Sequence, residues 1–228
     1  MEKKVEHPFV SCSISAPPKS GKTYLACTFP EPIKLYSFEH GAKFVVEKCF
    51  PGKKIDIQEF KLPIIDSDSP APYAEKIWEE FQKQFKEDAY SGKYQTLIVD
   101  TATHLWAVLR QAITEAKNRK RLTEVEYALP NLKMGSIYTH AYEAGVNFVV
   151  INYLRDKYVK GENTGELELN GWSQTEGLVD VVIEMKRETK GGRTQMTALI
   201  KDNRFDRDQN GKSFIDTSYD ELMLVLGV

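Results

Sequence analysis

The sequence Ala16-Pro17-Pro18-Lys19-Ser20-Gly21-Lys22-Thr23 decides how this chain folds. It follows a short apolar run at 9–14 that predicts a buried strand, and a helix-like segment at 22–29 follows it. The spacing matches the phosphate-loop pattern G-x-x-x-x-G-K-[ST], with alanine in place of the first glycine. Main-chain N–H groups of a tight loop, together with a helix N-terminus, form a concave anion site. The stretch therefore predicts a cradle for the phosphates of a nucleotide.

The residues at the end of this loop have separate chemical roles. Gly21 leaves room for the phosphates, Lys22 places a positive charge beside them, and the Thr23 hydroxyl is a hard oxygen ligand for Mg²⁺. The two prolines carry no N–H group, so the donors come mainly from Lys19 to Thr23. We expect ATP and Mg²⁺ as cofactors. The alternative is a proline-rich turn that precedes a helix by chance.

A second motif supplies the acidic group that a magnesium nucleotide needs. Leu97, Ile98 and Val99 predict a fully buried strand, and Asp100 ends it. This is a Walker B pattern, in which Asp100 would hold the Mg²⁺. Taken alone it is weak, because an aspartate at this position is also a common helix cap. The phosphate loop earlier in the chain strengthens it.

Composition limits the class of protein. At 228 residues we expect one domain, and the formal net charge of -2 excludes a strongly basic nucleic-acid coat. No apolar run reaches the ~18–20 residues of a membrane span, and we expect a cytoplasmic protein. Cys12, Cys27 and Cys49 have no C-x-x-C spacing, so we expect reduced thiols in the core.

The order of the predicted elements indicates an α/β fold. Strands are predicted at 33–38, 54–60, 94–100, 146–152, 179–185 and 194–201, and helices at 73–90, 103–116, 131–144 and 218–226. Apolar strands separated by helices predict a mostly parallel central sheet flanked by helices, with antiparallel hairpin strands at the C-terminal edge. The polar, glycine-dotted segment 153–177 predicts a long irregular loop of functional importance.

With these motifs in order, the chain resembles the RecA family. The strand at 33–38 leads into Glu39-His40-Gly41, as the RecA segment that carries the catalytic glutamate does. The length and the proline-rich loop look most like the short RecA-core ATPases of bacteriophages, which include single-strand annealing proteins. The resemblance implies one RecA-like P-loop NTPase domain over 1–228. Its core covers about 9–205, with a strand and a helix at 213–226.

The resemblance also implies roles for single residues. Glu39 would be the general base that orients the attacking water. Asn152, at the end of the strand 146–152, would sense the γ-phosphate. Lys201 and Arg204 would reach the γ-phosphate of a neighbouring subunit. The alternatives are an exposed turn carboxylate, a strand-end asparagine and a solvated hairpin end.

DNA and a second copy of the chain are the partners that the resemblance implies. Single-stranded DNA would meet cations after the predicted helix 103–116 and in the segment 153–177, although glutamates make the second half of that segment acidic. The candidates are Lys117, Arg119, Lys120, Arg121, Arg155, Lys157 and Lys160. We expect assembly into a ring or filament, and a single-strand DNA-binding protein is a further candidate partner. If a phage encodes the chain, the compartment is the host-cell cytoplasm.

Two other functions are compatible with the same motifs. One is a P-loop kinase of nucleotides or small molecules, with the segment 153–177 as its lid. The other is a nucleotide switch without turnover, in which Ala16 weakens hydrolysis.

Overall fold

The computed structural model describes residues 9–64, 71–119 and 121–226. Its strands are β1 (Ser11–Ala16), β2 (Ile33–Ser37), β3 (Ile55–Glu59), β4 (Thr96–Asp100), β5 (Asn147–Val159), β6 (Glu162–Asn170), β7 (Val181–Lys190), β8 (Arg193–Asn203) and β9 (Ser213–Ile215). Its α-helices are α1 (Lys22–Cys27), α2 (Ala42–Cys49), α3 (Ala74–Tyr90), α4 (Ala102–Ala116), α5 (Ala128–Ala144), α6 (Thr175–Leu178) and α7 (Tyr219–Leu226). Short 3-10 turns lie at Glu124–Tyr127 and Arg207–Gln209.

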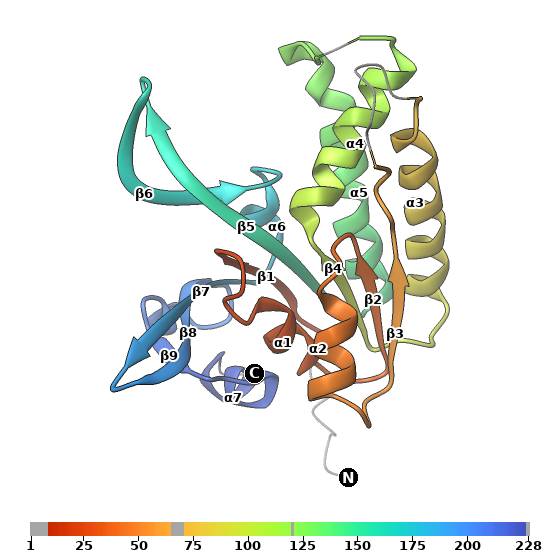
Figure 1. Cartoon of the computed structure of the whole chain (residues 1–228). Coiled ribbons are helices and arrows are strands. Elements are labelled where there is room, and N and C mark those ends of the chain that lie inside the picture. The colour runs from red at the N-terminus through yellow and green to blue at the C-terminus, as the bar shows by residue number, and fades with distance from the viewer. Residues whose placement is uncertain (1–8, 65–70, 120, 227–228) are drawn as a thin grey trace.

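The strands form one sheet in the order β3-β2-β4-β5-β1-β7-β8-β9, and β6 pairs with the outer part of β5 (Figure 1). The pairings among β3, β2, β4, β5, β1 and β7 are parallel. Those of β6, β8 and β9 are antiparallel. The predicted mostly parallel sheet with antiparallel strands at the C-terminal edge is therefore confirmed. Carboxyl ends of the parallel strands meet at one edge, which places the residues that follow them together.

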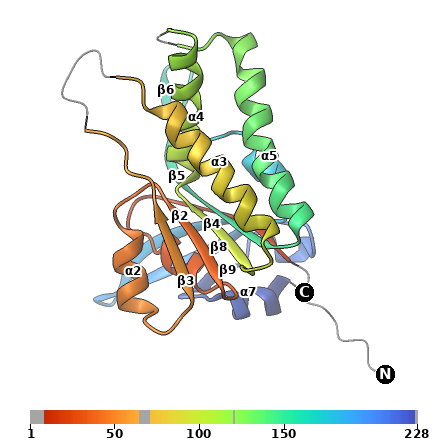
Figure 2. The same cartoon turned by 90° about the vertical axis from the view of Figure 1, so that its right-hand side faces the viewer.

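Helices cover both faces of the sheet. The helices α3, α4 and α5 pack on one face, while α1, α2 and α7 lie on the other (Figures 1 and 2). The alternation of side chains along a strand divides the core accordingly. Val99 and Val150 join the first cluster, whereas Ile98 and Ile151 join the second. Burial on both faces explains why these strands are continuously apolar.

One predicted loop is a β-hairpin. Residues 153–177 were expected to be irregular, but β5 continues to Val159 and β6 returns antiparallel to it. The hairpin projects from the body of the molecule (Figure 1), and we call it the β5–β6 arm. The backbone ladder joins these polar strands, and charges also pair across them: Arg155 with Glu168 at 2.8 Å, and Lys157 with Glu166 at 2.7 Å.

Two smaller expectations also need correction. The helix α2 was not predicted, and Cys49 at its end is exposed, although Cys12 and Cys27 are buried as expected. The helix α5 begins at Ala128 rather than near 131, because Pro130 in its first turn needs no intrahelical N–H bond. Within the described ranges, no helix combines the length and the apolar character needed to cross a membrane.

Candidate nucleotide site

The phosphate loop joins β1 to α1 at the carboxyl edge of the sheet. Ala16 continues the strand and is fully buried, so alanine meets no conformational conflict there. The loop turns instead at Lys19 and Gly21, with φ of 61° and 82°. A Cβ on Gly21 would also lie 3.2 Å from Met196 Cγ, a methionine of β8. Glycine is needed at this position both for the left-handed backbone and for the close packing.

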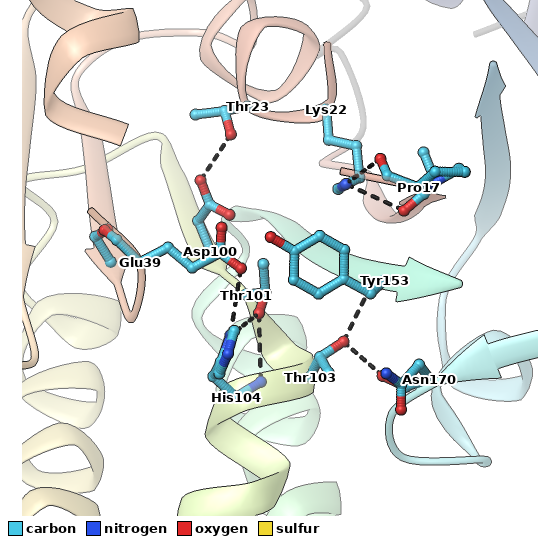
Figure 3. A network of polar contacts seen from close by, with 12 residues as sticks. Pro17, Lys22, Thr23, Glu39, Asp100, Thr101, Thr103, His104, Tyr153 and Asn170 are labelled. Atoms are coloured by element: carbon cyan, nitrogen blue, oxygen red, sulfur yellow. Dashed lines mark hydrogen bonds and ion pairs between the residues drawn. The ribbon is translucent and has the colours of Figure 1, made fainter. Parts of the chain in front are cut away.

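Lys22 is held in the middle of the loop. Its ammonium donates to the carbonyl oxygens of Ala16 at 3.1 Å and Pro17 at 2.9 Å (Figure 3). The same nitrogen lies 4.5 Å from the centre of the Tyr153 ring. Burial lowers the pKa of Lys22, while the charges of Asp100 and Glu39 oppose that shift. An ammonium has three N–H donors, so one is left for a phosphate oxygen.

Thr23 and Asp100 meet directly opposite this lysine. The Thr23 hydroxyl donates to Asp100 Oδ2 at 2.8 Å, which joins the first turn of α1 to the end of β4 (Figure 3). Burial raises the pKa of Asp100 to about 6, with the charge of Glu39 in the same direction; the Thr23 hydrogen bond and the charges of Lys22 and His104 oppose it. A hydroxyl and a carboxylate at this separation are hard oxygen ligands that fit Mg²⁺ together with phosphate oxygens.

Glu39 lies beside Asp100 because their strands are neighbours. Ser37 on β2 pairs with Asp100 on β4, and Glu39 follows two residues later. Its Oε1 atom is 3.3 Å from His104 Nδ1, and this nitrogen is also 2.8 Å from the Thr101 hydroxyl oxygen (Figure 3). The same Oε1 is buried and has no hydrogen bond of good geometry. The ion-pair contact with His104 therefore fixes the position of the Glu39 carboxylate.

The pKa of Glu39 reflects this environment. Burial pushes it upward, but contacts with His104 and with the Tyr153 hydroxyl, and the charge of Lys22, lower it overall. Glu39 is therefore ionised at neutral pH, as a group that accepts a proton or orients water must be. Lys22, Thr23, Glu39 and Asp100 thus converge at one edge of the sheet, as the sequence predicted.

Two residues that the sequence did not suggest complete the site. His104 lies in the first turn of α4, whose N-cap is Thr101. Tyr153 lies at the root of the β5–β6 arm and contacts both Lys22 and Glu39. Its backbone N–H donates to Thr103 Oγ1 at 3.0 Å. His104 could have been found from its position four residues after Asp100 in the sequence. Tyr153 could not, because it reaches the site only through the order of the strands.

Asn152 is placed differently from its predicted role. It is fully buried, its amide donates to the Ser13 hydroxyl at 3.4 Å, and its Oδ1 atom has no partner. Side chains two residues apart on a strand share a face, so Asn152 lies on the same face of the sheet as Val150, which packs under α3–α5. The helix α1 covers the opposite face. The neighbour of Asn152, Tyr153, is the residue of β5 that reaches Lys22.

The two residues expected to act on a neighbouring subunit are engaged in ion pairs. Lys201 Nζ lies 3.6 Å from Glu184 and 3.9 Å from Glu176. Arg204 Nη1 contacts Asp180 at 3.0 Å, just before the start of β7. Arg204 therefore sits at the amino edge of the parallel strands, opposite its own phosphate loop.

Most of the predicted DNA contacts are also paired. Lys117 and Arg119 share Glu126 at 2.7 and 3.0 Å, and the hydrogen bond from Lys117 leads the effects that lower the pKa of Glu126 to about 2. Arg155 and Lys157 bind glutamates of β6. Lys160 is exposed in the tight turn of the arm, and Arg121 is exposed near the end of α4. Lys120 lies outside the described residues.

Comparisons with known proteins concern the family and the fold. Residues 9–222 match a family model described as an AAA domain. No curated protein sequence matches the chain significantly. The solved structure of a KaiC-like protein from the hyperthermophilic archaeon Pyrococcus horikoshii is similar, with a TM-score of 0.56 and 15% identity over 91% of this chain and 85% of that one. At this identity the likeness concerns the fold alone, and it confirms the RecA-like α/β fold.

Proposed function

The chain belongs to the AAA domain family and has the fold of a P-loop ATPase, and from this premise we propose that it hydrolyses ATP in response to single-stranded DNA. The observation that carries the proposal is the convergence of Lys22, Thr23, Asp100 and Glu39 at the end of β1, β2 and β4. The biological setting that we propose is recombination or strand annealing of the phage type.

The chain's own residues divide the work of hydrolysis. The remaining N–H of Lys22 would bind a phosphate oxygen, and the backbone of Lys19 to Thr23 would surround the phosphates. Thr23 and Asp100 would hold Mg²⁺, which neutralises charge on the phosphates. Glu39, kept in place by the contact of its Oε1 atom with His104, would orient the attacking water through its carboxylate. Tyr153 covers Lys22 from the arm side and keeps bulk water away from it.

An ATPase assay with and without single-stranded DNA tests the proposal. We expect Mg²⁺-dependent turnover that rises when single-stranded DNA is added, and no turnover in Lys22→Ala, which loses the ammonium at the centre of the loop. A chain that binds ATP but hydrolyses none with or without DNA would be a switch instead. Unstimulated turnover would remove DNA from the proposal and leave the ATPase.

One cavity favours a kinase as the second candidate. A hollow of about 250 Å³ adjoins Glu39 and His104 at the ends of β2 and β3, with the stacked rings of Phe38 and Phe60 in its wall. A phosphate acceptor in this hollow would lie next to the carboxylate of Glu39. Loss of ATP only when a small hydroxyl compound is added, with a phosphorylated product, would favour this function over hydrolysis.

A mixing experiment tests whether subunits share a site. Arg204→Ala and Lys22→Ala should each be inactive alone, because the first lacks the cation donated to a neighbour and the second lacks the nucleotide lysine. Mixed, some interfaces would join an intact loop to an intact Arg204, and we expect partial recovery of ATPase activity. No recovery at any ratio, with both variants folded by circular dichroism, would place Arg204 outside the mechanism and leave it as the partner of Asp180.

A further inference from the structure

We propose that Arg110 and Arg121 form a binding site for a phosphate group in a cavity on the outer side of α4, separate from the nucleotide loop. The cavity has a volume of about 450 Å³. Arg110, Gln111 and Thr114 line it from α4, and Arg121 and Tyr127 line it from the segment that follows. The proposal needs only a phosphate group, so it stands without the proposed DNA partner.

The first argument is charge. Both arginines line one cavity, and none of its described lining residues is acidic. Other cations nearby are neutralised: Lys117 and Arg119 share Glu126. Two guanidinium groups without a carboxylate concentrate positive potential in a chain whose net charge is -2. The guanidinium fork matches the geometry of phosphate oxygens.

The second argument is how Arg110 is held. Its guanidinium lies 5.6 Å from the centre of the Trp106 ring, so an aromatic face rather than an anion fixes it. Its Nε atom is buried and has no hydrogen-bond partner in the described part of the chain. No hydrogen bond or ion pair with a described residue engages the other guanidinium nitrogens of Arg110, so their N–H groups remain available to an anion in the cavity that this residue lines.

The third argument is position. Arg110, Gln111 and Thr114 are neighbours on α4 at separations of one, three and four residues, and His104 lies six residues before Arg110 on the same helix. At ~1.5 Å per residue, Arg110 is about 9 Å along the axis from His104, the partner of Glu39. A phosphate bound here would therefore contact the helix that carries part of the nucleotide site.

The test compares two double variants that remove the same charge. Arg110→Gln with Arg121→Gln removes the unpaired cations, and Lys117→Gln with Arg119→Gln removes the paired ones from the same end of α4. Binding is followed by anisotropy of a fluorescent oligo(dT) and by tryptophan fluorescence during titration with inorganic phosphate. Both are done in the Lys22→Ala background, so that the nucleotide loop does not contribute. The single variant Arg121→Gln, at an exposed position, guards against misfolding of the double variant.

We expect the Arg110/Arg121 variant to bind oligo(dT) at least ~10-fold more weakly, with the salt slope reduced by about 1.4, at ~0.7 per phosphate contact. The Lys117/Arg119 variant should stay near the wild type. A response to phosphate without binding of oligo(dT) would identify a small phosphate compound as the ligand. This outcome would support the site and contradict only the proposed DNA partner. Equal losses in both double variants, or no response of the wild type to either ligand, would overturn the site.

Discussion

Glu39→Gln should retain ATP binding and lose at least ~10²-fold in kcat, the usual scale for a lost general base. The glutamine side chain has the same shape, but its neutral amide cannot take a proton from the attacking water. Glu39 makes none of the hydrogen bonds that hold Lys22 or Thr23, so the nucleotide cradle should remain intact. Single-turnover hydrolysis and the affinity for a fluorescent ATP analogue measure the two effects separately.

Glu59→Gln is the matched control. Glu59 ends β3, pairs in register with Ser37, and lines the same hollow as Glu39. Within that hollow it carries the same charge, but Glu39 is the one whose carboxylate meets His104. Near-normal turnover in Glu59→Gln with loss in Glu39→Gln assigns the effect to position rather than to charge. Near-normal turnover in Glu39→Gln would remove this residue from the reaction.

The loop and its two carboxylates could be predicted because their signals are local. Lys22 and Thr23 belong to one motif, and Asp100 ends a run of buried apolar residues. Parallel strands bring residues at their carboxyl ends together whatever their distance in sequence, which is why Glu39 arrives beside Asp100. The common edge follows from the type of sheet, whereas the proximity of the two carboxylates also needs β2 and β4 to be neighbours.

What the sequence did not reveal depends on pairing across the chain. Tyr153 reaches Lys22 because β5 lies next to β1, and Ala16 pairs in register with Tyr153. The β5–β6 arm looked irregular because its residues are polar. Its strands pair antiparallel through the backbone, and ion pairs such as Arg155 with Glu168 also join them. Likewise, a run of cations near 117–121 suggests a DNA contact until Glu126 is seen to neutralise two of them.

Asp100→Asn should make the protein without nucleotide more stable at neutral pH. Burial raises the pKa of this carboxyl to about 6 from its ordinary 3.8, so the folded protein holds the proton more tightly than the unfolded chain does. The free energy of unfolding therefore falls as pH rises between these two pKa values. The difference of about 2 pKa units corresponds to ~3 kcal/mol, fully lost above pH ~6. Asparagine stays neutral and avoids this loss.

Urea unfolding in the presence of EDTA measures the effect at several pH values. The gap between variant and wild type should widen by roughly 1.4 kcal/mol between about pH 5 and 7.5, because part of the loss already occurs below pH 5. Asp56→Asn is a control of opposite sign. Burial alone would raise the pKa of Asp56, but hydrogen bonds from Lys34 and Tyr94 lower it overall, so removing that charge should destabilise the protein at neutral pH.

Addition of a non-hydrolysable ATP analogue with Mg²⁺ should reverse the order of stability at Asp100. A ligand that binds only the folded state stabilises it in proportion to its affinity. The wild-type carboxylate would then face a cation, and its melting temperature should rise well above that of Asp100→Asn, which lacks the charge. A variant that is less stable without ligand at every pH, and is stabilised equally by the analogue, would contradict both the burial of an unfavourable charge and its use in holding Mg²⁺. If both results are as expected, the buried charge of Asp100 destabilises the protein without nucleotide and at the same time places a metal ligand beside Thr23.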